Sequence, residues 1–229
     1  MTSNIILSTK EYNVVGTRPI RHDGYDKVTG KALYSADMNL PSMLFGKVLR
    51  SPHAHAIIKS IDTSKAEAHP DVRAVVTSAD FVLHENKPIL LSSGGIPQNM
   101  FHRSSNCLAR GKVFYKGHAV AAIAADTVHA AEEAMSLIEV EYEVLPAVTD
   151  VESAMAEGAP QLHDNIPGNV ASHTELELGD LEKGFAEADL VMEKVYRTNT
   201  VHQGYIEPHS ATAWWTPQGK ITIWASSQG

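Results

Sequence analysis

The sequence is poor in cysteine, because among its 229 residues only Cys107 carries a thiol. One thiol cannot form an internal disulfide, and it is too few ligands for an iron–sulfur cluster or a zinc–thiolate site. Long hydrophobic runs are also missing, since no segment approaches the roughly 20 apolar residues of a membrane span. The short apolar stretch at residues 5–7 has no basic segment before it, unlike a signal peptide. We therefore expect a cytoplasmic protein without a cysteine-bound metal.

Basic residues are in the minority. The chain has 19 Lys and Arg against 27 Asp and Glu, which gives a formal net charge of −8. A protein that binds nucleic acid needs basic residues to displace counterions from phosphates, so this balance argues against a nucleic-acid partner. Hydrophobic residues make up 43% of the chain, which is enough for the packed core of one or two domains.

Short apolar or alternating segments occur throughout the first two thirds of the chain. They predict five strands, at residues 43–51, 55–62, 72–77, 118–125 and 138–144. In the last of these, the alternation predicts that four side chains face a core: Ile138, Val140, Tyr142 and Val144. The first residues show no such pattern, and we expect 1–17 to form an extended arm.

Two helices are predicted between these strands. Asp62 precedes a short helical segment, and Asp126 precedes a segment whose apolar residues recur at helical spacing, so we predict both as N-caps. Residues 84–110 contain "SSGG" and two prolines, and they are predicted to form a long loop.

Proline-bearing turns cluster between residues 145 and 170. Because proline and glycine interrupt regular structure, we predict a linker at 148–169. The linker separates a first domain at 18–147 from an incomplete second domain at 170–229. The fold class is predicted to be α+β, since strands and helices are mixed in both parts.

The second domain is predicted to contain a helix, a strand and a hairpin. Asp180 is the expected N-cap of the helix, and residues 188–198 have the composition of a strand. The segments "HSATAWWT" and "KITIWAS" flank "PQG" and should pair as a β-hairpin, with Gly219 in the left-handed conformation.

The open end of this hairpin is the candidate site. With residues 217–219 as a three-residue loop, Gln228 lies opposite Pro208 and Gly229 opposite Glu207; a two-residue loop places Gln228 opposite Glu207 instead. Either register brings Glu207 and Gln228 together. An amide donor beside a carboxylate and a glycine is more typical of a cofactor contact than of a core.

Two other patterns could bind cations. His53 and His55 would point the same way on a strand, as two ligands of one metal do, but no third ligand is near in sequence. We favour structural histidines there. Three alternate carboxylates could hold a hard cation, but the solvated face of a strand is the commoner explanation: Glu139, Glu141 and Glu143.

Several stretches together resemble the large molybdenum subunit of the xanthine dehydrogenase / aldehyde oxidase family. "RHDGYDKVTGKALYSADMNLP" and "YKGHAVAAIAADTVHAAEEA" are similar to its α/β hammerhead domain. "GDLEKGFAEADLVMEKVYRT", "HQGYIEPHSATAWW" and "IWASSQG" are similar to the beginning of its molybdopterin-binding domain, which is incomplete here and ends in the hairpin. The resemblance spans residues 18–229.

The resemblance implies a molybdenum hydroxylase that oxidises an aldehyde or an N-heteroaromatic compound, purine- or nicotinate-like, with water as the oxygen source. It implies a molybdenum–molybdopterin cofactor, with iron–sulfur clusters and FAD on partner subunits. The tripeptide 226–228 matches the family motif whose glutamine donates to a molybdenum oxo ligand, so Gln228 and Gly229 are the expected cofactor contacts. Gln203 and Glu207 are expected pocket residues.

The family's glycine-rich segment, later pterin-binding loops and catalytic glutamate have no counterpart in these 229 residues. No catalytic residue is therefore expected in this chain, and we expect it to be inactive without a partner chain or segment that supplies them. The alternative is a non-catalytic scaffold or interaction module that retains the hammerhead domain. The sequence does not identify the substrate.

Overall fold

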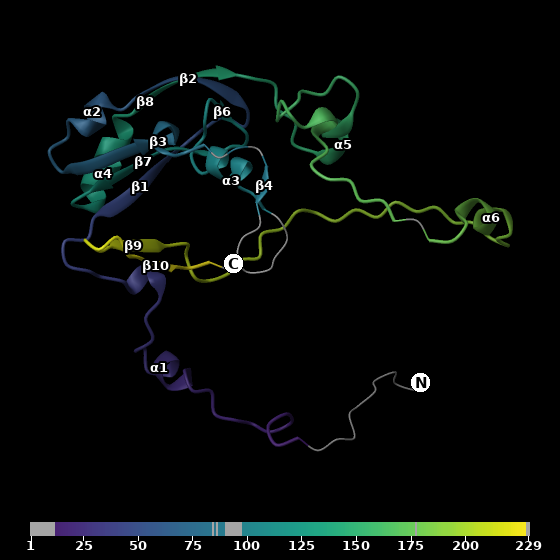
Figure 1. The fold of residues 1–229 in the computed structure, drawn as a ribbon, viewed down its shortest axis with the longest axis horizontal. Helices are drawn as coiled ribbons and strands as arrows, with labels where there is room; N and C mark the ends of the chain where they lie inside the picture. Colours follow the sequence, from purple (N-terminus) through teal and green to yellow (C-terminus); the bar gives the residue numbers. More distant parts are fainter. Residues whose placement is uncertain (1–11, 84, 86, 90–97, 177, 228–229) are drawn as a thin grey trace. The chain divides into compact units, whose positions relative to one another are not determined.

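The computed structural model describes residues 12–83, 85, 87–89, 98–176 and 178–227 (Figure 1). The chain forms two compact units, one made of Pro41–Lys194 and the other of Met1–Leu40 together with Val195–Gly229. The strand pairs of the described residues are all antiparallel, and helices are few and short. The predicted α+β class is therefore confirmed.

The first sheet of the larger unit has the order β1–β7–β3. Its strands are β1 (Phe45–Arg50), β7 (Ala119–Ala125) and β3 (Val72–Thr77), so β7 is hydrogen-bonded along both edges. Helix α4 (Val128–Ser136) packs against β1 and β7, and the short α2 (Ser64–Glu67) packs against β3. The core between them is built from small and branched side chains: Ala66, Ala121, Ile123, Ala134 and Ile138.

The second sheet has the order β6–β2–β8. It consists of β6 (Lys112–Val113), β2 (Ala56–Asp62) and β8 (Glu139–Val144). A second core cluster, formed by Ala56, Ala109, Val113 and Val120, packs against it. All five strands predicted in this part of the chain are present, with ends that differ by a few residues.

One predicted core position in β8 is wrong. Val140 and Tyr142 are half-buried and Ile138 is buried, as the alternation predicts, but Val144 is 62% exposed. Val144 is the last residue of β8, and alternation specifies a face without specifying that another element covers it.

The predicted helix caps are displaced by one residue. Thr127, not Asp126, caps α4, because its hydroxyl accepts a hydrogen bond from the Ala130 N–H at 3.0 Å. Asp126 instead pairs with Arg73 of β3, whose Nε donates to Oδ1 at 2.9 Å. Thr63 likewise precedes α2, and Asp62 accepts from the Ser64 N–H at 2.9 Å.

The predicted loop at 84–110 is partly wrong. Strand β4 (Pro88–Ile89) pairs with β5 (Gln98–Asn99), and helix α3 follows at Met100–Asn106. The "SSGG" that favoured a loop lies outside the described residues. Helix α3 is short and contains Ser and Asn, which favour turns over helices, so its local pattern indicates a helix only weakly.

The predicted linker carries local structure of its own. Helix α5 (Val151–Met155) is capped by Asp150, and a 3₁₀ turn, η3, follows at Pro167–Asn169. Asn169 ties the segment together: its Oδ1 accepts from the Leu162 N–H at 2.8 Å, and its Nδ2 donates to the Ala154 carbonyl at 2.8 Å. The domain boundaries at 147 and 170 stay predictions.

Beyond this segment, one predicted helix is present and one predicted strand is not. Asp180 caps α6 (Leu181–Ala186) by accepting from the Lys183 N–H at 2.9 Å, as predicted. Residues 188–198 are irregular and exposed. The strand prediction there is wrong, because composition supplies no neighbouring strand for the hydrogen-bond ladder.

The smaller unit contains α1 (Gly24–Val28), the 3₁₀ turn η1 (Ser35–Asp37), and the predicted hairpin of β9 (Ala211–Trp215) and β10 (Ile221–Ala225). Ile221 pairs with Trp215, which is the register of the three-residue loop, and Gly219 has φ +80°. The hairpin prediction is confirmed, including its register.

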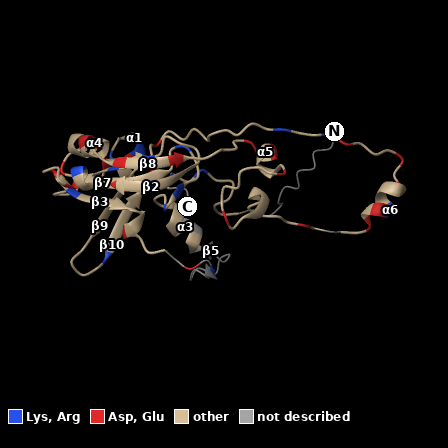
Figure 2. Ribbon diagram, turned by 90° about the horizontal axis from the view of Figure 1, so that it is seen from above, with Lys and Arg blue, Asp and Glu red and all other residues tan. Residues whose placement is uncertain are grey.

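Charges are interspersed along the described ribbon and form no basic stripe there (Figure 2). No helix within the described ranges is long and apolar enough to cross a membrane.

A pair of valines tests the second core cluster. Val120 is fully buried, whereas Val144 on β8 of the same unit is 62% exposed. Val120→Ala should lower the free energy of unfolding by about 2 kcal/mol, because it removes buried methyl groups and leaves a cavity. Val144→Ala should change it by no more than about 0.5 kcal/mol. Urea unfolding followed by far-UV circular dichroism measures both, and equal losses would contradict the described packing.

Buried His118 predicts a pH dependence of stability. Its Nδ1 accepts from the Phe114 N–H at 3.3 Å and its Nε2 donates to the Asn106 carbonyl at 3.1 Å, so the ring is neutral. Burial lowers the pKa of His118 below its ordinary value. Below about pH 6.5 the unfolded chain therefore binds more protons than the folded one, and stability falls as the pH falls.

Replacing His118 with Gln should reduce this pH slope by at most about 1.4 kcal/mol per pH unit. Urea unfolding between about pH 5 and 7 measures it, and His129→Gln, at an exposed position of α4, is the control. An unchanged slope in the His118 variant would show that the ring is not held neutral.

Candidate cofactor-contact site at the open end of the hairpin

Ser226 fixes the open end of the hairpin. Its N–H donates to the Ser210 carbonyl at 3.0 Å, which continues the β9–β10 register by one pair. Its hydroxyl accepts from the Ser210 N–H at 2.8 Å and donates to the Pro208 carbonyl at 2.9 Å. The chain just before β9 is therefore held against the chain just after β10.

Tyr205 and His209 form a second contact in the same region. The Tyr205 hydroxyl lies 2.7 Å from Nε2 of His209, and their ring centroids are 4.8 Å apart. His202 extends the group, because its Nδ1 accepts from the Gly204 N–H at 3.0 Å and its ring lies 5.1 Å from that of Tyr205. These contacts give a defined conformation to a segment that has no regular secondary structure.

Two adjoining hollows lie around these residues. The larger, of about 570 Å³, is lined by Gln203, Tyr205, His209 and Ser226, among others. The smaller, of about 230 Å³, shares the last three of these and adds Glu207. The predicted pocket residues Gln203 and Glu207 thus line neighbouring hollows, but not the same one.

The predicted cofactor contacts Gln228 and Gly229 lie outside the described residues. Ser226, two positions before Gln228, follows the register from which their positions opposite Pro208 and Glu207 were predicted. Their role as cofactor contacts stays a prediction.

His53 and His55 both make contacts within the larger unit. The His53 ring packs edge-on against Tyr142 of β8, with centroids 5.1 Å apart. His55 is 4% exposed, and its Nδ1 lies 2.7 Å from the Pro146 carbonyl. The described residues contain no group of three or more His, Cys, Asp or Glu side chains that could hold a metal ion.

The three carboxylates of β8 form a solvated face. All three are exposed; Glu139 pairs with Lys65, and Glu143 lies 3.3 Å from Lys59. Exposed pairs of this kind contribute little to stability, and the favoured explanation is confirmed.

The groups at the hairpin end suit an organic cofactor better than a directly bound metal. Besides the imidazole of His209, the larger hollow is lined by an amide, a phenol and three serine hydroxyls, which are neutral hydrogen-bonding groups: Gln203, Tyr205, Ser210, Ser226 and Ser227. A metal held by protein side chains needs clustered imidazole or carboxylate ligands instead. A cofactor that brings its own metal ligands needs only binding and orientation from the protein, and the described residues fit that requirement.

Comparison with known families identifies the class of protein. The model described as "aldehyde oxidase and xanthine dehydrogenase, a/b hammerhead domain" matches residues 29–146, and the model described as "molybdopterin cofactor-binding domain" matches residues 162–229. The two models in this order define a class of protein in which an α/β hammerhead domain precedes a molybdopterin cofactor-binding domain. The chain belongs to the aldehyde oxidase and xanthine dehydrogenase family, as the sequence resemblance predicted.

Individual relatives support the same family assignment. The chain is 37% identical over 209 residues to a probable xanthine dehydrogenase subunit of Bacillus subtilis, covering 91% of this chain and 26% of that protein. It is 33% identical over 223 residues to the nicotinate dehydrogenase large molybdopterin subunit of Eubacterium barkeri, covering 96% and 48%. The structure of quinoline 2-oxidoreductase from Pseudomonas putida 86 superposes with a TM-score of 0.77 at 33% identity, covering 93% and 27%. The chain thus spans about a quarter to a half of these relatives' lengths.

Sequence reasoning missed the Tyr205–His209 contact and the anchoring role of the Ser226 hydroxyl. The tyrosine and histidine are four residues apart in a segment without helical or strand periodicity, so no spacing rule brings them together. Ser226 belongs to the tripeptide that matches the family motif, but that match does not specify that its hydroxyl bonds to Ser210 and Pro208.

Removing the Ser226 hydroxyl tests the site's architecture. Ser226→Ala leaves the Ser210 N–H without its acceptor, so we expect the Ser210 amide to exchange with solvent about tenfold faster. Ser210→Ala, which keeps both backbone groups of that residue, is the matched control. Amide hydrogen exchange followed by NMR makes the measurement, and equal exchange at position 210 in the wild type and Ser226→Ala would contradict the described anchor.

Proposed function

We propose that this chain forms part of the molybdenum subunit of a hydroxylase that oxidises an aldehyde or an N-heteroaromatic substrate, purine- or nicotinate-like. Water supplies the oxygen atom, and two electrons pass to acceptors on partner subunits. The observation that carries the proposal is the order of the two family matches, hammerhead domain first and cofactor-binding domain second, over most of the chain. Relatives named for xanthine, nicotinate and quinoline support an N-heteroaromatic substrate.

Molybdenum–molybdopterin is the proposed cofactor, and when bound it would supply the redox chemistry. The residues of this chain would orient it. We assign Gln228 as a hydrogen-bond donor to the cofactor, with Gly229 allowing close approach of the backbone. Gln203 and Glu207 would line the surrounding pocket, since each borders one of the two hollows that share Ser226.

The proposal includes a further chain or segment of the molybdenum subunit. One face of the hairpin consists of Ile221, Ile223, Ala225 and their cross-strand partners Trp215, Ala213 and Ala211, and we call it the hairpin face. Its large side chains are exposed, with Ile223 at 64% and Trp215 at 70%. Apolar patches of this kind mark interaction surfaces, and the remainder of the cofactor domain is the occupant we propose. On this proposal the isolated chain is inactive.

Iron–sulfur and flavin subunits are the proposed electron acceptors, and the complex would be cytoplasmic. Relatives named as subunits or large chains support a multi-subunit assembly. A single exposed cysteine, Cys107, leaves the described residues without the thiolates that an iron–sulfur cluster needs, so the clusters would be on partners.

Paired glutamine variants of the complete complex test the cofactor role. Gln228→Ala should lower molybdenum content or substrate turnover by about 10- to 100-fold, as loss of a group that orients a metal centre does. Gln218→Ala is the matched control, because Gln218 is exposed in the turn at the other end of the hairpin and should leave both unchanged. Metal analysis and turnover of aldehydes and N-heteroaromatics provide the readouts.

Unchanged metal content and turnover in Gln228→Ala would refute the assigned cofactor contact. If the complex also keeps full activity when this chain is left out, the chain is a non-catalytic scaffold. Stoichiometric molybdenum on the isolated chain would contradict the need for a further segment.

A further inference from the structure

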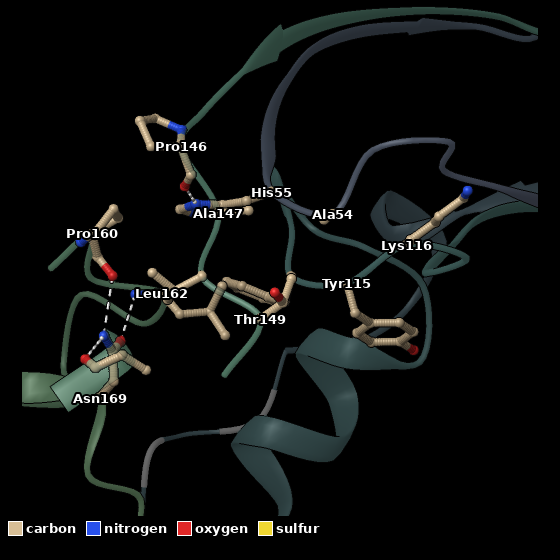
Figure 3. Close-up of a pocket in the computed structure, with 13 residues that line it drawn as sticks. Ala54, His55, Tyr115, Lys116, Pro146, Ala147, Thr149, Pro160, Leu162 and Asn169 are labelled. Carbon is tan, nitrogen blue, oxygen red and sulfur yellow. Dashed lines mark hydrogen bonds between the residues drawn. The ribbon is translucent and has the colours of Figure 1, made fainter. Parts of the chain in front are cut away.

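A cavity of about 470 Å³ lies in the larger unit, within the range of small-molecule sites (Figure 3). Three parts of the chain surround it: the residues before β2, the loop between β6 and β7, and residues 146–169, most of which are the predicted linker. Its walls are mainly rings and aliphatic groups, including Phe114, Tyr115, Pro146, Pro160 and Leu162.

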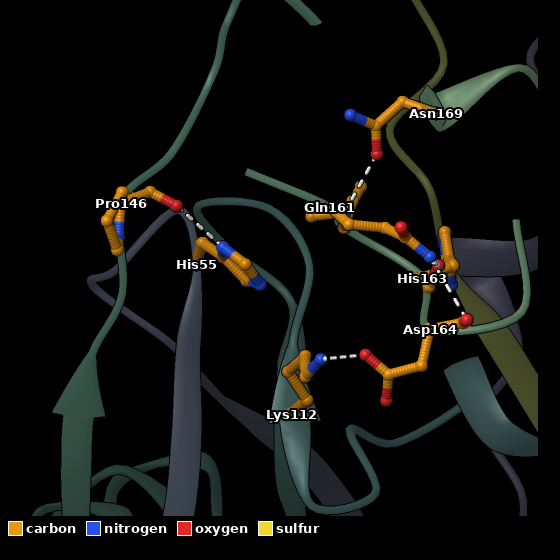
Figure 4. A network of polar contacts seen from close by, with 8 residues as sticks. His55, Lys112, Pro146, Gln161, His163, Asp164 and Asn169 are labelled. Atoms are coloured by element: carbon orange, nitrogen blue, oxygen red, sulfur yellow. Dashed lines mark hydrogen bonds and ion pairs between the residues drawn. The ribbon is translucent and has the colours of Figure 1, made fainter. Parts of the chain in front are cut away.

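The wall formed by the predicted linker is held in place by hydrogen bonds. Asn169 accepts from the Leu162 N–H and donates to the Pro160 carbonyl at 3.0 Å. Close by, Lys112 of β6 pairs with Asp164 at 2.8 Å and Gln161 donates to the His163 carbonyl at 2.8 Å (Figure 4). These contacts shape the cavity before any ligand binds, and they occupy the polar groups of Asn169.

His55 lines the cavity and carries a hydrogen-bond acceptor that no described residue uses. The ring is 4% exposed and lines the cavity, and its Nδ1 lies 2.7 Å from the Pro146 carbonyl. A carbonyl only accepts, so Nδ1 donates to it, and the tautomer that carries its proton on Nδ1 presents a lone pair at Nε2. Nε2 is buried and has no hydrogen-bond partner among the described residues. Unsatisfied buried acceptors are rare in native proteins and indicate a missing partner.

The charges around the cavity indicate whether that partner is ionised or neutral. Lys116 is the one charged residue of the lining, and it is exposed. In Figure 3 its ammonium end points away from Leu162 and Thr149. An ionised ligand would therefore lose its hydration without a buried counterion, which is costly. A neutral ligand meets no such penalty, and the flat rings of Phe114 and Tyr115 favour an aromatic one.

We propose that this cavity is a binding site for a neutral, single-ring or fused-ring aromatic molecule that donates one hydrogen bond, through a hydroxyl or ring N–H, to Nε2 of His55. Phenols, indoles and hydroxylated N-heteroaromatics belong to this class. The site rests on no part of the proposed cofactor chemistry, because all its lining residues belong to the unit Pro41–Lys194.

Phenol and anisole form a matched pair of probes. Both carry one benzene ring, but only phenol donates a hydrogen bond. With the full chain labelled with ¹⁵N at histidine, phenol should shift the Nε2 resonance of His55, with a dissociation constant of about 1 mM, and leave that of exposed His129 unchanged. Anisole should bind about tenfold more weakly and should not shift Nε2 in the same direction.

Two variants separate the hydrogen bond from the cavity itself. His55→Asn keeps a side-chain amide that can donate to the Pro146 carbonyl but removes Nε2, so the preference for phenol over anisole should vanish. Ala147→Leu fills the cavity from an exposed lining position and should abolish the binding of both probes. Ala156→Leu, an exposed alanine outside the lining, is its control and should bind phenol as the wild type does.

Equal affinity for phenol and anisole in the wild-type chain would overturn the role of His55. Phenol binding that survives Ala147→Leu would place the ligand elsewhere and overturn the site. Absence of phenol binding to the folded chain, judged by dispersed amide resonances, would leave water as the partner of Nε2 and overturn the proposal as well.

Discussion

The larger unit depends on strand β7, which is hydrogen-bonded to β1 on one edge and to β3 on the other. The same strand contributes Val120 to the core cluster that packs against the second sheet, and hydrogen bonds hold its start. The Ala119 carbonyl accepts from the Ala109 N–H at 2.7 Å, and the His118 carbonyl accepts from the Ser51 N–H at 2.9 Å. The small side chains of β7 let α4 approach closely, so packing and hydrogen bonding reinforce each other. Loss of this strand would therefore affect all three core clusters of the described residues, since it contributes to each.

The smaller unit is organised differently, because its sheet has only two strands. A two-stranded hairpin is marginal by itself and needs packing on one face. The hairpin face is apolar and exposed. At the end of the hairpin away from the turn, the Ser226 hydroxyl is hydrogen-bonded to Pro208 and Ser210 and holds the two strands together. A cofactor contact placed at this end is positioned by local hydrogen bonds, whereas its rigidity depends on whatever covers the face. This is the physical reason why we propose that the chain acts with further protein.

Much of the fold was predictable from local pattern. Five strands of the larger unit, the Asp180 cap and the three-residue hairpin register all follow from alternation and turn chemistry, which depend on near neighbours in sequence. Predictions that depend on contacts between residues far apart in sequence were more often wrong. Asp126, for example, was expected to cap α4 but pairs with Arg73. Residues 188–198 have strand composition without a strand to pair with. In the candidate site, Gln203 and Glu207 were predicted as pocket residues and each lines a hollow, whereas the Tyr205–His209 contact was not predicted.

The sequence by itself determined the family, the order of the two domains and the pairing of the final hairpin, because motifs and turn types depend on residues that are adjacent in sequence. Tertiary structure alone decided which side chains lose contact with water. It covers Val140 and leaves Val144 exposed on the same strand, and it keeps His118 neutral by burial. It also brings Pro146 to Nδ1 of His55, which fixes the proton on one nitrogen and leaves the other as an acceptor. Such properties arise from groups far apart in the chain, and no local pattern specifies them.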